Sequence, residues 1–173
     1  MAIPSALASD SRRISELGLY ATRTIAKQRS SQGSRGILRF SARGELDSFL
    51  QAKSDEELQR YVVQPQIGSD SEEFSASIFG FGDGTFQGPI VFRRLLAKEG
   101  YTNYAETVVC PPKVLDTLEK VAKKCHLLGP TNFQFRKERG EFLVMYINAR
   151  LSSSTSLNTA LRYNEALIAV NYL

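Results

Sequence analysis

Gln134, Asn148 and Arg150 could carry the chemistry of this chain, because their types and spacing can place two amides and a guanidinium in one site. Residues two apart on a strand share a face, so Tyr146, Asn148 and Arg150 should line up together. The surrounding sequence is apolar, and polar groups in such surroundings need a hydrogen-bonding partner. That partner could be a metal–phosphate complex. Alternatively, these side chains cap loops or face water.

A second candidate for phosphate chemistry is the glycine- and serine-rich segment that follows Lys27 and runs to Gly36, between two β-prone segments. Glycines let backbone amides approach an anion closely, and successive N–H groups can form a concave nest for phosphate. The segment is not a P-loop, since no Gly-Lys-Ser/Thr sequence opens a helix there. An ordinary hairpin loop would have the same composition.

The elements that must position these residues can be predicted from the spacing of apolar residues and from capping residues. Helices are expected near 9–18, 42–52, 54–60, 111–129 and 158–172. Strands are expected at 22–27, 37–40, 61–68, 72–79, 86–96, 103–109, 129–136 and 144–150. Pro65 interrupts the third of these strands and suggests a hinge, so we expect two domains, 1–63 and 64–173.

Charge is distributed unevenly along the chain, whose formal net charge is +4. Residues 1–43 contain eight Lys and Arg against two acidic residues, whereas residues 44–74 contain two against eight. A basic segment suggests an anionic ligand, either small phosphates or nucleic acid. Nucleic acid is the weaker interpretation, because aromatic residues are not interleaved with the basic residues as single-strand binders require.

Length and composition narrow the class of protein. The 173 residues, 42% of them hydrophobic, allow one domain with a sizeable core or two small subdomains. No apolar run is long enough to span a bilayer, and the N-terminus lacks the pattern of a secretory signal. Cys110 and Cys125 have no second ligand pair, so neither a zinc site nor a disulfide framework is supported. We therefore expect a cytoplasmic protein with no membrane partner.

Taken in order, these segments resemble the ATP-grasp superfamily, most closely the ATP-binding domain of the carbamoyl-phosphate synthase large subunit and related carboxylate–amine ligases. The resemblance rests on Lys27 with the loop after it, on segment 63–68 with Glu73, and on segments 132–135 and 147–150. It covers residues 14–173. It implies an α+β fold, in which two α+β subdomains hold ATP between them.

The resemblance also implies a role for each site residue. The implied nucleotide contacts are Lys27, Ser31, Gly33 and Ser34 at the phosphates, Gln64, Gln66 and Ile67 at adenine, and Glu73, or alternatively Glu72, at the ribose. The implied magnesium ligands are Gln134 and Asn148, and Arg150 matches the arginine that steadies the transferring phosphoryl group. Phosphoryl transfer depends mostly on positioning and on neutralising charge, so these residue types suit the chemistry.

The implied cofactors are ATP and Mg²⁺, and the implied substrates are a small-molecule carboxylate or bicarbonate and an amine or ammonia. ATP phosphorylates the carboxylate, and the amine then attacks the acyl phosphate. The family has a preceding substrate domain that does not occur in this chain, so we expect the chain to be one part of a larger protein or assembly.

Tyr146 departs from the family pattern, in which a glutamate stands two residues before the asparagine. A tyrosine is neutral near pH 7 and is a poor substitute for a carboxylate that bridges two Mg²⁺ ions. The substitution predicts weak metal binding and slow turnover. The alternative function is therefore a catalytically impaired, nucleotide-binding ATP-grasp module.

Overall fold

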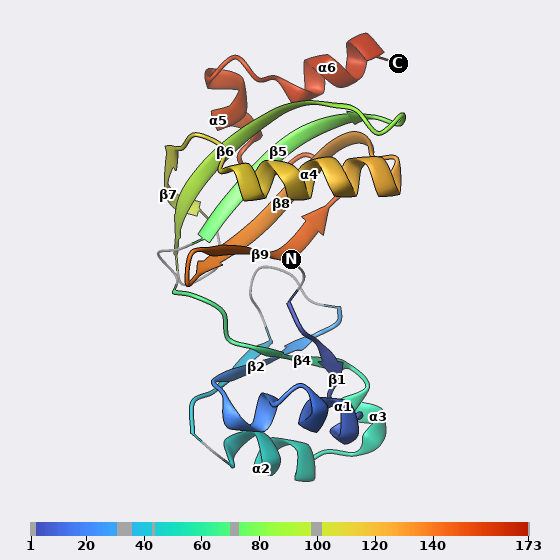
Figure 1. Ribbon diagram of the computed structural model, residues 1–173, viewed down its shortest axis with the longest axis vertical. Coiled ribbons are helices and arrows are strands. Elements are labelled where there is room, and N and C mark those ends of the chain that lie inside the picture. Colours follow the sequence, from blue (N-terminus) through green and yellow to red (C-terminus); the bar gives the residue numbers. More distant parts are fainter. Residues whose placement is uncertain (1–2, 31–35, 43, 70–72, 98–101, 173) are drawn as a thin grey trace. The chain divides into compact units, whose positions relative to one another are not determined.

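The computed structural model describes residues 3–30, 36–42, 44–69, 73–97 and 102–172, which fold as two units (Figure 1). The N-terminal unit is Ile3–Ile67, and the C-terminal unit comprises Gly68–Ala97 and Thr102–Leu173. The predicted boundary between residues 63 and 64 falls inside strand β4 (Tyr61–Pro65), because this strand remains paired as far as Pro65.

The described part of the N-terminal unit contains a four-stranded antiparallel sheet with short helices. Its elements are β1 (Ala6–Leu7), α1 (Ser11–Glu16), the 3₁₀ helix η1 (Leu19–Ala21), β2 (Thr24–Gln28), β3 (Ile37–Phe40), α2 (Glu45–Gln51), α3 (Asp55–Leu58) and β4, and the sheet order is β1-β4-β2-β3. The Asp10 carboxylate caps α1 by accepting from the Arg13 amide at 2.9 Å. Ser54 and Glu57 form a capping box at the start of α3.

One face of this sheet carries the core of the N-terminal unit. Ala26 on β2 and Val63 on β4 are fully buried and pack with Ile14 of α1 and with Leu46 and Leu58 from the other helices. Because side chains alternate along a strand, the neighbours of Ala26 and Val63 lie on the opposite face. That opposite face includes Lys27.

The described part of the C-terminal unit contains a five-stranded antiparallel sheet in the order β7-β6-β5-β8-β9. Its elements are β5 (Glu73–Phe81), β6 (Phe86–Leu96), β7 (Thr102–Thr107), α4 (Pro112–Cys125), β8 (Leu128–Glu138), β9 (Glu141–Asn148), α5 (Thr155–Ala160) and α6 (Glu165–Tyr172). The predicted strand pair near the C-terminus is thus confirmed. Its turn consists of Arg139 and Gly140, both with positive φ, as a tight hairpin between twisted strands requires.

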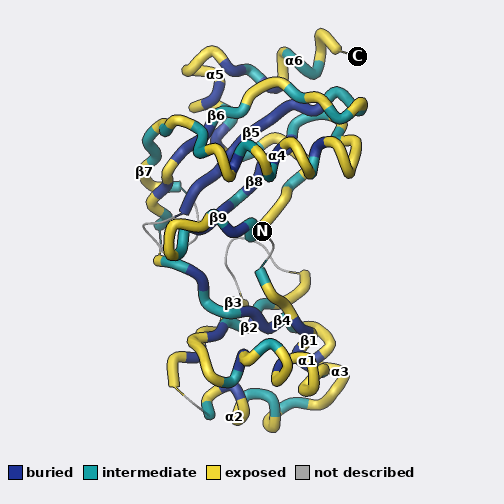
Figure 2. The backbone as a smooth tube through the Cα atoms, in the orientation of Figure 1, coloured by how far each residue is buried: buried dark blue, intermediate teal, exposed yellow. Residues whose placement is uncertain are grey.

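Helix α4 covers one face of this sheet, as Figure 1 shows. Val114 and Leu118 of α4 are fully buried against Phe133 and Phe135 of β8. Strand β5 is buried along almost its whole length (Figure 2). It is the central strand of the sheet, and helix α6 also contacts it.

Helix α6 reaches β5 from the side opposite α4. The Tyr172 ring packs on Phe79 and Phe81, with ring centroids 5.9 and 5.2 Å apart. Phe79 points away from Ile78, which belongs to the core under α4.

Among the described residues, no helix is long and apolar enough to cross a membrane.

The prediction of one helix over 158–172 is wrong, because the structure contains two helices, α5 and α6. Arg162, between them, has φ of +64°, which a continuous helix does not allow. The Tyr163 amide donates back to the Asn158 carbonyl at 2.9 Å. The Tyr163 hydroxyl donates to the Gln87 carbonyl of β6, also at 2.9 Å, so the break brings this ring onto the sheet.

Candidate functional site

The face of the five-stranded sheet opposite α4, called the polar face below, carries polar side chains in cross-strand rows. The three rows are Arg94–Glu73–Arg136, Ser75–Gln134–Tyr146 and Ser77–Asn132–Asn148. Three residues singled out in the sequence, Gln134, Tyr146 and Asn148, therefore share one face. Asn132 and the two arginines were not predicted, although strand periodicity places Asn132 and Arg136 on the side of Gln134.

An irregularity in β9 gives Tyr146 its place on the polar face. Gln134 pairs with Tyr146, but the next residue, Phe135, pairs with Val144, so Met145 has no partner on β8. This bulge lets Val144 pack against the core under α4 while Tyr146 stays on the opposite face. In a regular strand the two residues would share a face.

Arg150 does not line up with Tyr146 and Asn148 on the strand, contrary to the sequence expectation, because β9 ends at Asn148. Its backbone amide donates to the Asn148 carbonyl at 2.8 Å in the turn that follows. Its side chain is exposed and donates from Nη1 to the Leu151 carbonyl at 2.9 Å. The guanidinium is therefore exposed to solvent beyond the end of the strand.

Glu73, the predicted ribose ligand, is 4% exposed and lies between two guanidinium groups. Arg94 Nη2 donates to Glu73 Oε1 at 2.5 Å, and Arg136 Nη2 donates to Oε2 at 3.4 Å. A ribose would therefore have to share these oxygens with the arginines, and its binding by Glu73 stays a prediction. Glu72, the alternative, lies outside the described residues.

The donor set on the polar face does not fit a magnesium ion bound by protein carboxylates. Gln134 and Asn148 offer neutral amide oxygens, and Tyr146 offers a phenol, whereas Mg²⁺ in proteins is usually held by one or two carboxylates. The acidic residue of the adjoining row, Glu73, has both oxygens bound by arginines. Nor do the described residues contain a cluster of three or more His, Cys, Asp or Glu that could hold a metal ion.

The N-terminal unit places two predicted nucleotide contacts, Lys27 and Gln64, on the face of its sheet opposite the core. Lys27 pairs with Val62, and Gln64 is the next residue along β4 on the same face. Burial lowers the pKa of the Lys27 amine. Gln64 is buried, and its Nε2 donates to Ser5 Oγ at 2.5 Å.

The other predicted nucleotide contacts follow β4 or fall in the loop after Lys27. The Gln66 amide donates to the Arg23 carbonyl at 2.8 Å, and Ile67 is 7% exposed. Gln66 Oε1 is buried without a hydrogen-bond partner among the described residues. The remaining contacts, Ser31, Gly33 and Ser34, lie outside the described residues.

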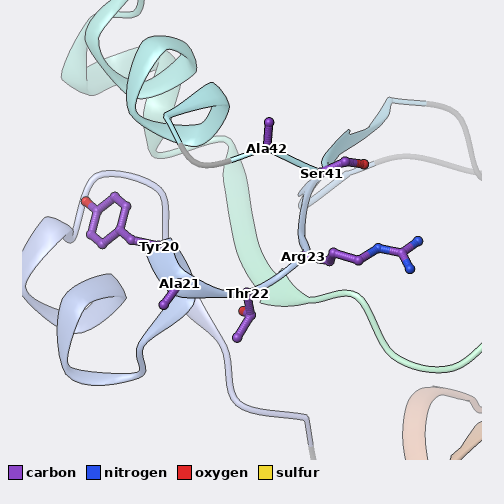
Figure 3. Close-up of a pocket in the computed structure, with 6 residues that line it drawn as sticks. All are labelled: Tyr20, Ala21, Thr22, Arg23, Ser41 and Ala42. Atoms are coloured by element: carbon purple, nitrogen blue, oxygen red, sulfur yellow. The ribbon is translucent and has the colours of Figure 1, made fainter.

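The N-terminal unit also has a surface pocket of about 400 Å³. The described residues that line it are Tyr20, Ala21, Thr22, Arg23, Ser41 and Ala42 (Figure 3). In Figure 3 the Tyr20 and Arg23 side chains extend in opposite directions, so they do not converge on one point. The amides of Ser41 and Ala42 already bind the Glu45 carboxylate, at 2.7 and 3.1 Å. None of the predicted site residues belongs to this lining.

No protein-family model matches the sequence, and no curated protein matches it either. Solved structures do match. An N5-carboxyaminoimidazole synthetase from Staphylococcus aureus, complexed with ADP, is 14% identical with a TM-score of 0.73. The match covers 96% of this chain and 46% of the synthetase chain. A biotin carboxylase from Campylobacter jejuni, as a β-γ-ATP complex, is 15% identical with a TM-score of 0.74. The match covers 99% of this chain and 42% of the biotin carboxylase chain.

A third match is the biotin carboxylase domain of 2-oxoglutarate carboxylase from Hydrogenobacter thermophilus, in complex with MgADP, ADP and bicarbonate. It is 14% identical with a TM-score of 0.67, and the match covers 90% of this chain and 37% of that chain. These neighbours are ATP-grasp enzymes. The chain therefore has the α+β ATP-grasp fold that its sequence predicts. It spans less than half the length of each of these three proteins.

Proposed function

We propose that this chain binds ATP as the nucleotide-binding part of an ATP-grasp ligase of the carbamoyl-phosphate-synthase-like kind. Such an enzyme activates a carboxylate or bicarbonate as an acyl phosphate, which an amine or ammonia then attacks. The observation that carries this proposal is the gathering of Gln134, Tyr146 and Asn148 on one sheet face. The neighbours crystallised with ADP, with MgADP and bicarbonate, or as an ATP complex support the class of ligand.

The proposed roles follow from the chemistry of each side chain. Lys27 and Arg150 supply positive charge for the phosphates, because phosphoryl transfer is accelerated by cations that neutralise developing charge. Gln134 and Asn148 orient the phosphate chain through their amides. Gln64, Gln66 and Ile67 are assigned to adenine, and Glu73 to the ribose.

Tyr146 favours a second candidate function, a nucleotide-binding module with impaired turnover. It stands opposite Gln134 in the position where the ligases resembled by the sequence have a glutamate. With this residue the site keeps no carboxylate that is free of arginines, among the residues described. Both candidates share the binding of ATP and differ in catalysis.

Thermal unfolding with added nucleotide tests the proposal. A ligand that binds only the folded state stabilises it by about 2.7 kcal/mol at a hundred times its dissociation constant. We expect ATP to raise the melting temperature. Phosphate release with a carboxylate or bicarbonate and an amine would then indicate the ligase, and stabilisation without release the impaired module. Stabilisation by a polyanion such as RNA but not by ATP would contradict both.

A further inference from the structure

Two buried guanidinium groups lie in the row of the polar face next to Gln134 and Tyr146. The side chains of Arg94 and Arg136 are 7% and 11% exposed, and Glu73 holds both of them. Arg94 Nε is buried and has no hydrogen-bond partner among the described residues. Guanidinium groups stay charged in proteins and donate in a planar fork that suits phosphate oxygens.

The Tyr146 hydroxyl lies within electrostatic range of this row. Burial raises the pKa of Tyr146, Glu73 raises it further, and Arg136 opposes this shift. The phenol therefore keeps its proton at neutral pH and can donate a hydrogen bond. A glutamate in the same place would instead present a negative charge.

The two ionic forms of a nucleotide need opposite kinds of protein group. A phosphate chain that arrives with Mg²⁺ needs oxygen ligands for the metal, carboxylates above all. A phosphate chain without a metal needs N–H and O–H donors and cations around its own oxygens. The polar face has groups of the second kind. They are the amide nitrogens of Gln134 and Asn148, the Tyr146 hydroxyl and the neighbouring Arg136 guanidinium.

We propose that the polar face binds the phosphate chain of the nucleotide as the metal-free anion, with hydrogen-bond donors and guanidinium groups in place of a magnesium ion. The inference rests on the proposed function for the class of ligand and adds the form in which that ligand binds. Complexation by Mg²⁺ removes charge from the phosphates and occupies some of their oxygens. The magnesium complex therefore binds this face more weakly than the free anion.

Calorimetric titration of the whole chain with ATP, once in EDTA and once with excess Mg²⁺, tests the proposal. We expect the dissociation constant in EDTA to be lower by about fivefold or more, roughly 1 kcal/mol in binding free energy. Binding that appears only with Mg²⁺ would overturn the inference and leave the proposed function standing. If ATP binds under neither condition, the proposed function fails and this inference fails with it.

Variants at position 146 locate the effect. Tyr146→Glu brings a negative charge to the phosphates, so its affinity for ATP in EDTA should fall about tenfold or more, while Mg²⁺ should restore it. Tyr146→Phe loses only the hydroxyl donor and should keep the preference for the metal-free nucleotide. Tyr104→Glu, an equivalent change at an exposed position on β7, is the matched control and should bind as the wild type does. Unchanged affinity of Tyr146→Glu in EDTA would show that the phosphates lie elsewhere.

Discussion

Tyr146 is an uncharged side chain among the polar residues of the polar face. It lies opposite Gln134, one row from the Glu73–Arg136 pair, and is 37% exposed, so other side chains of similar size can replace it. Its phenol adds no charge to a site whose other members are amides. A carboxylate at this position would give Mg²⁺ an anionic ligand, whereas the carboxylate of Glu73 on the same face is bound by two arginines.

Tyr146→Glu should therefore raise the rate of magnesium-dependent ATP hydrolysis by about tenfold or more. A tenfold gain in rate needs only about 1.4 kcal/mol of transition-state stabilisation. Phosphate release by the purified variant and the wild type measures the change. Tyr146→Gln, which is neutral and close in size to glutamate, is the control and should not gain. An equal gain in both variants would show that removal of the ring, and not the new charge, is responsible.

A second residue-scale feature is the fully buried pair Asn158 and Glu165, which joins the end of α5 to the start of α6. Asn158 Nδ2 donates to Glu165 Oε2 at 2.8 Å. The remaining oxygen of each side chain, Asn158 Oδ1 and Glu165 Oε1, is buried and has no hydrogen-bond partner among the described residues. Protonation of Oε1 would give it a hydrogen to donate and would also remove a buried charge.

Burial raises the pKa of Glu165, and the Asn158 hydrogen bond opposes this only in part. A carboxyl whose folded-state pKa is raised adds stability below its unfolded-state pKa, and this stability is lost as pH rises through the folded-state pKa. Glu165→Gln keeps the neutral shape at every pH. The variant should thus be more stable than the wild type at pH 8, by about 1–3 kcal/mol, and the difference should shrink toward pH 4. Urea unfolding at both pH values measures it; a difference independent of pH would contradict this account.

At the scale of elements, β5 passes unusually close to the connection between α4 and β8. A Cβ at Gly80 would overlap the Leu127 carbonyl, which accepts a hydrogen bond from the Gly82 amide at 2.9 Å. Gly80→Ala should therefore push the two segments apart and lower the free energy of unfolding by about 3 kcal/mol. Gly140→Ala is the control: its Cβ would meet nothing within 4 Å, and only its positive φ adds a cost of about 1–2 kcal/mol.

Equal losses in these two variants, measured by urea unfolding, would contradict this account, because Gly80 has no positive φ and the overlap with Leu127 should cost more than the strained φ at Gly140. A larger loss for Gly80→Ala would instead confirm that β5 is held against the α4–β8 connection. This contact matters for the site because β5 carries Glu73 near its other end, and Glu73 holds the two arginines of the polar face.

Elements with strong local signals could be predicted from the sequence. Pro112 and the apolar spacing that follows fix α4, and Ser54 with Glu57 fixes the start of α3, because helix periodicity and capping are local. The break between α5 and α6 could not be predicted in this way. It depends on a positive φ at Arg162 and on a contact between Tyr163 and β6, which are features of the tertiary structure.

The candidate site was predictable to the same extent. Strand alternation alone puts Tyr146 and Asn148 on one side, and the structure confirms this. The pairing that brings Arg136 to Glu73 joins residues 63 positions apart in sequence, and no spacing rule reveals such a contact. The bulge at Met145, which turns Val144 to the other face, has no signal in the sequence either.

At the scale of the whole molecule, the residues that the structure describes form two hydrophobic cores with no residue in common. The core of the N-terminal unit includes Ile14, Leu46 and Val63, and the core of the C-terminal unit includes Leu118 and Phe133. Each lies under the helix-covered face of its own sheet, and each sheet places predicted ligand contacts on the other face. The cores can therefore be perturbed one at a time.

Leu46→Ala and Leu118→Ala each remove a buried leucine and should each cost about 2–5 kcal/mol of local stability. Since the cores are separate, the two losses should appear in different parts of the chain. Native-state hydrogen exchange should report faster exchange in 3–67 for Leu46→Ala and in 68–172 for Leu118→Ala, with the other unit little changed. Uniform acceleration along the whole chain in either variant would show that the two units unfold as one cooperative body. With ATP bound at saturation, protection should rise again at the amides flanking Lys27 and Gln134, because a ligand that binds only the folded state opposes the opening of its own site.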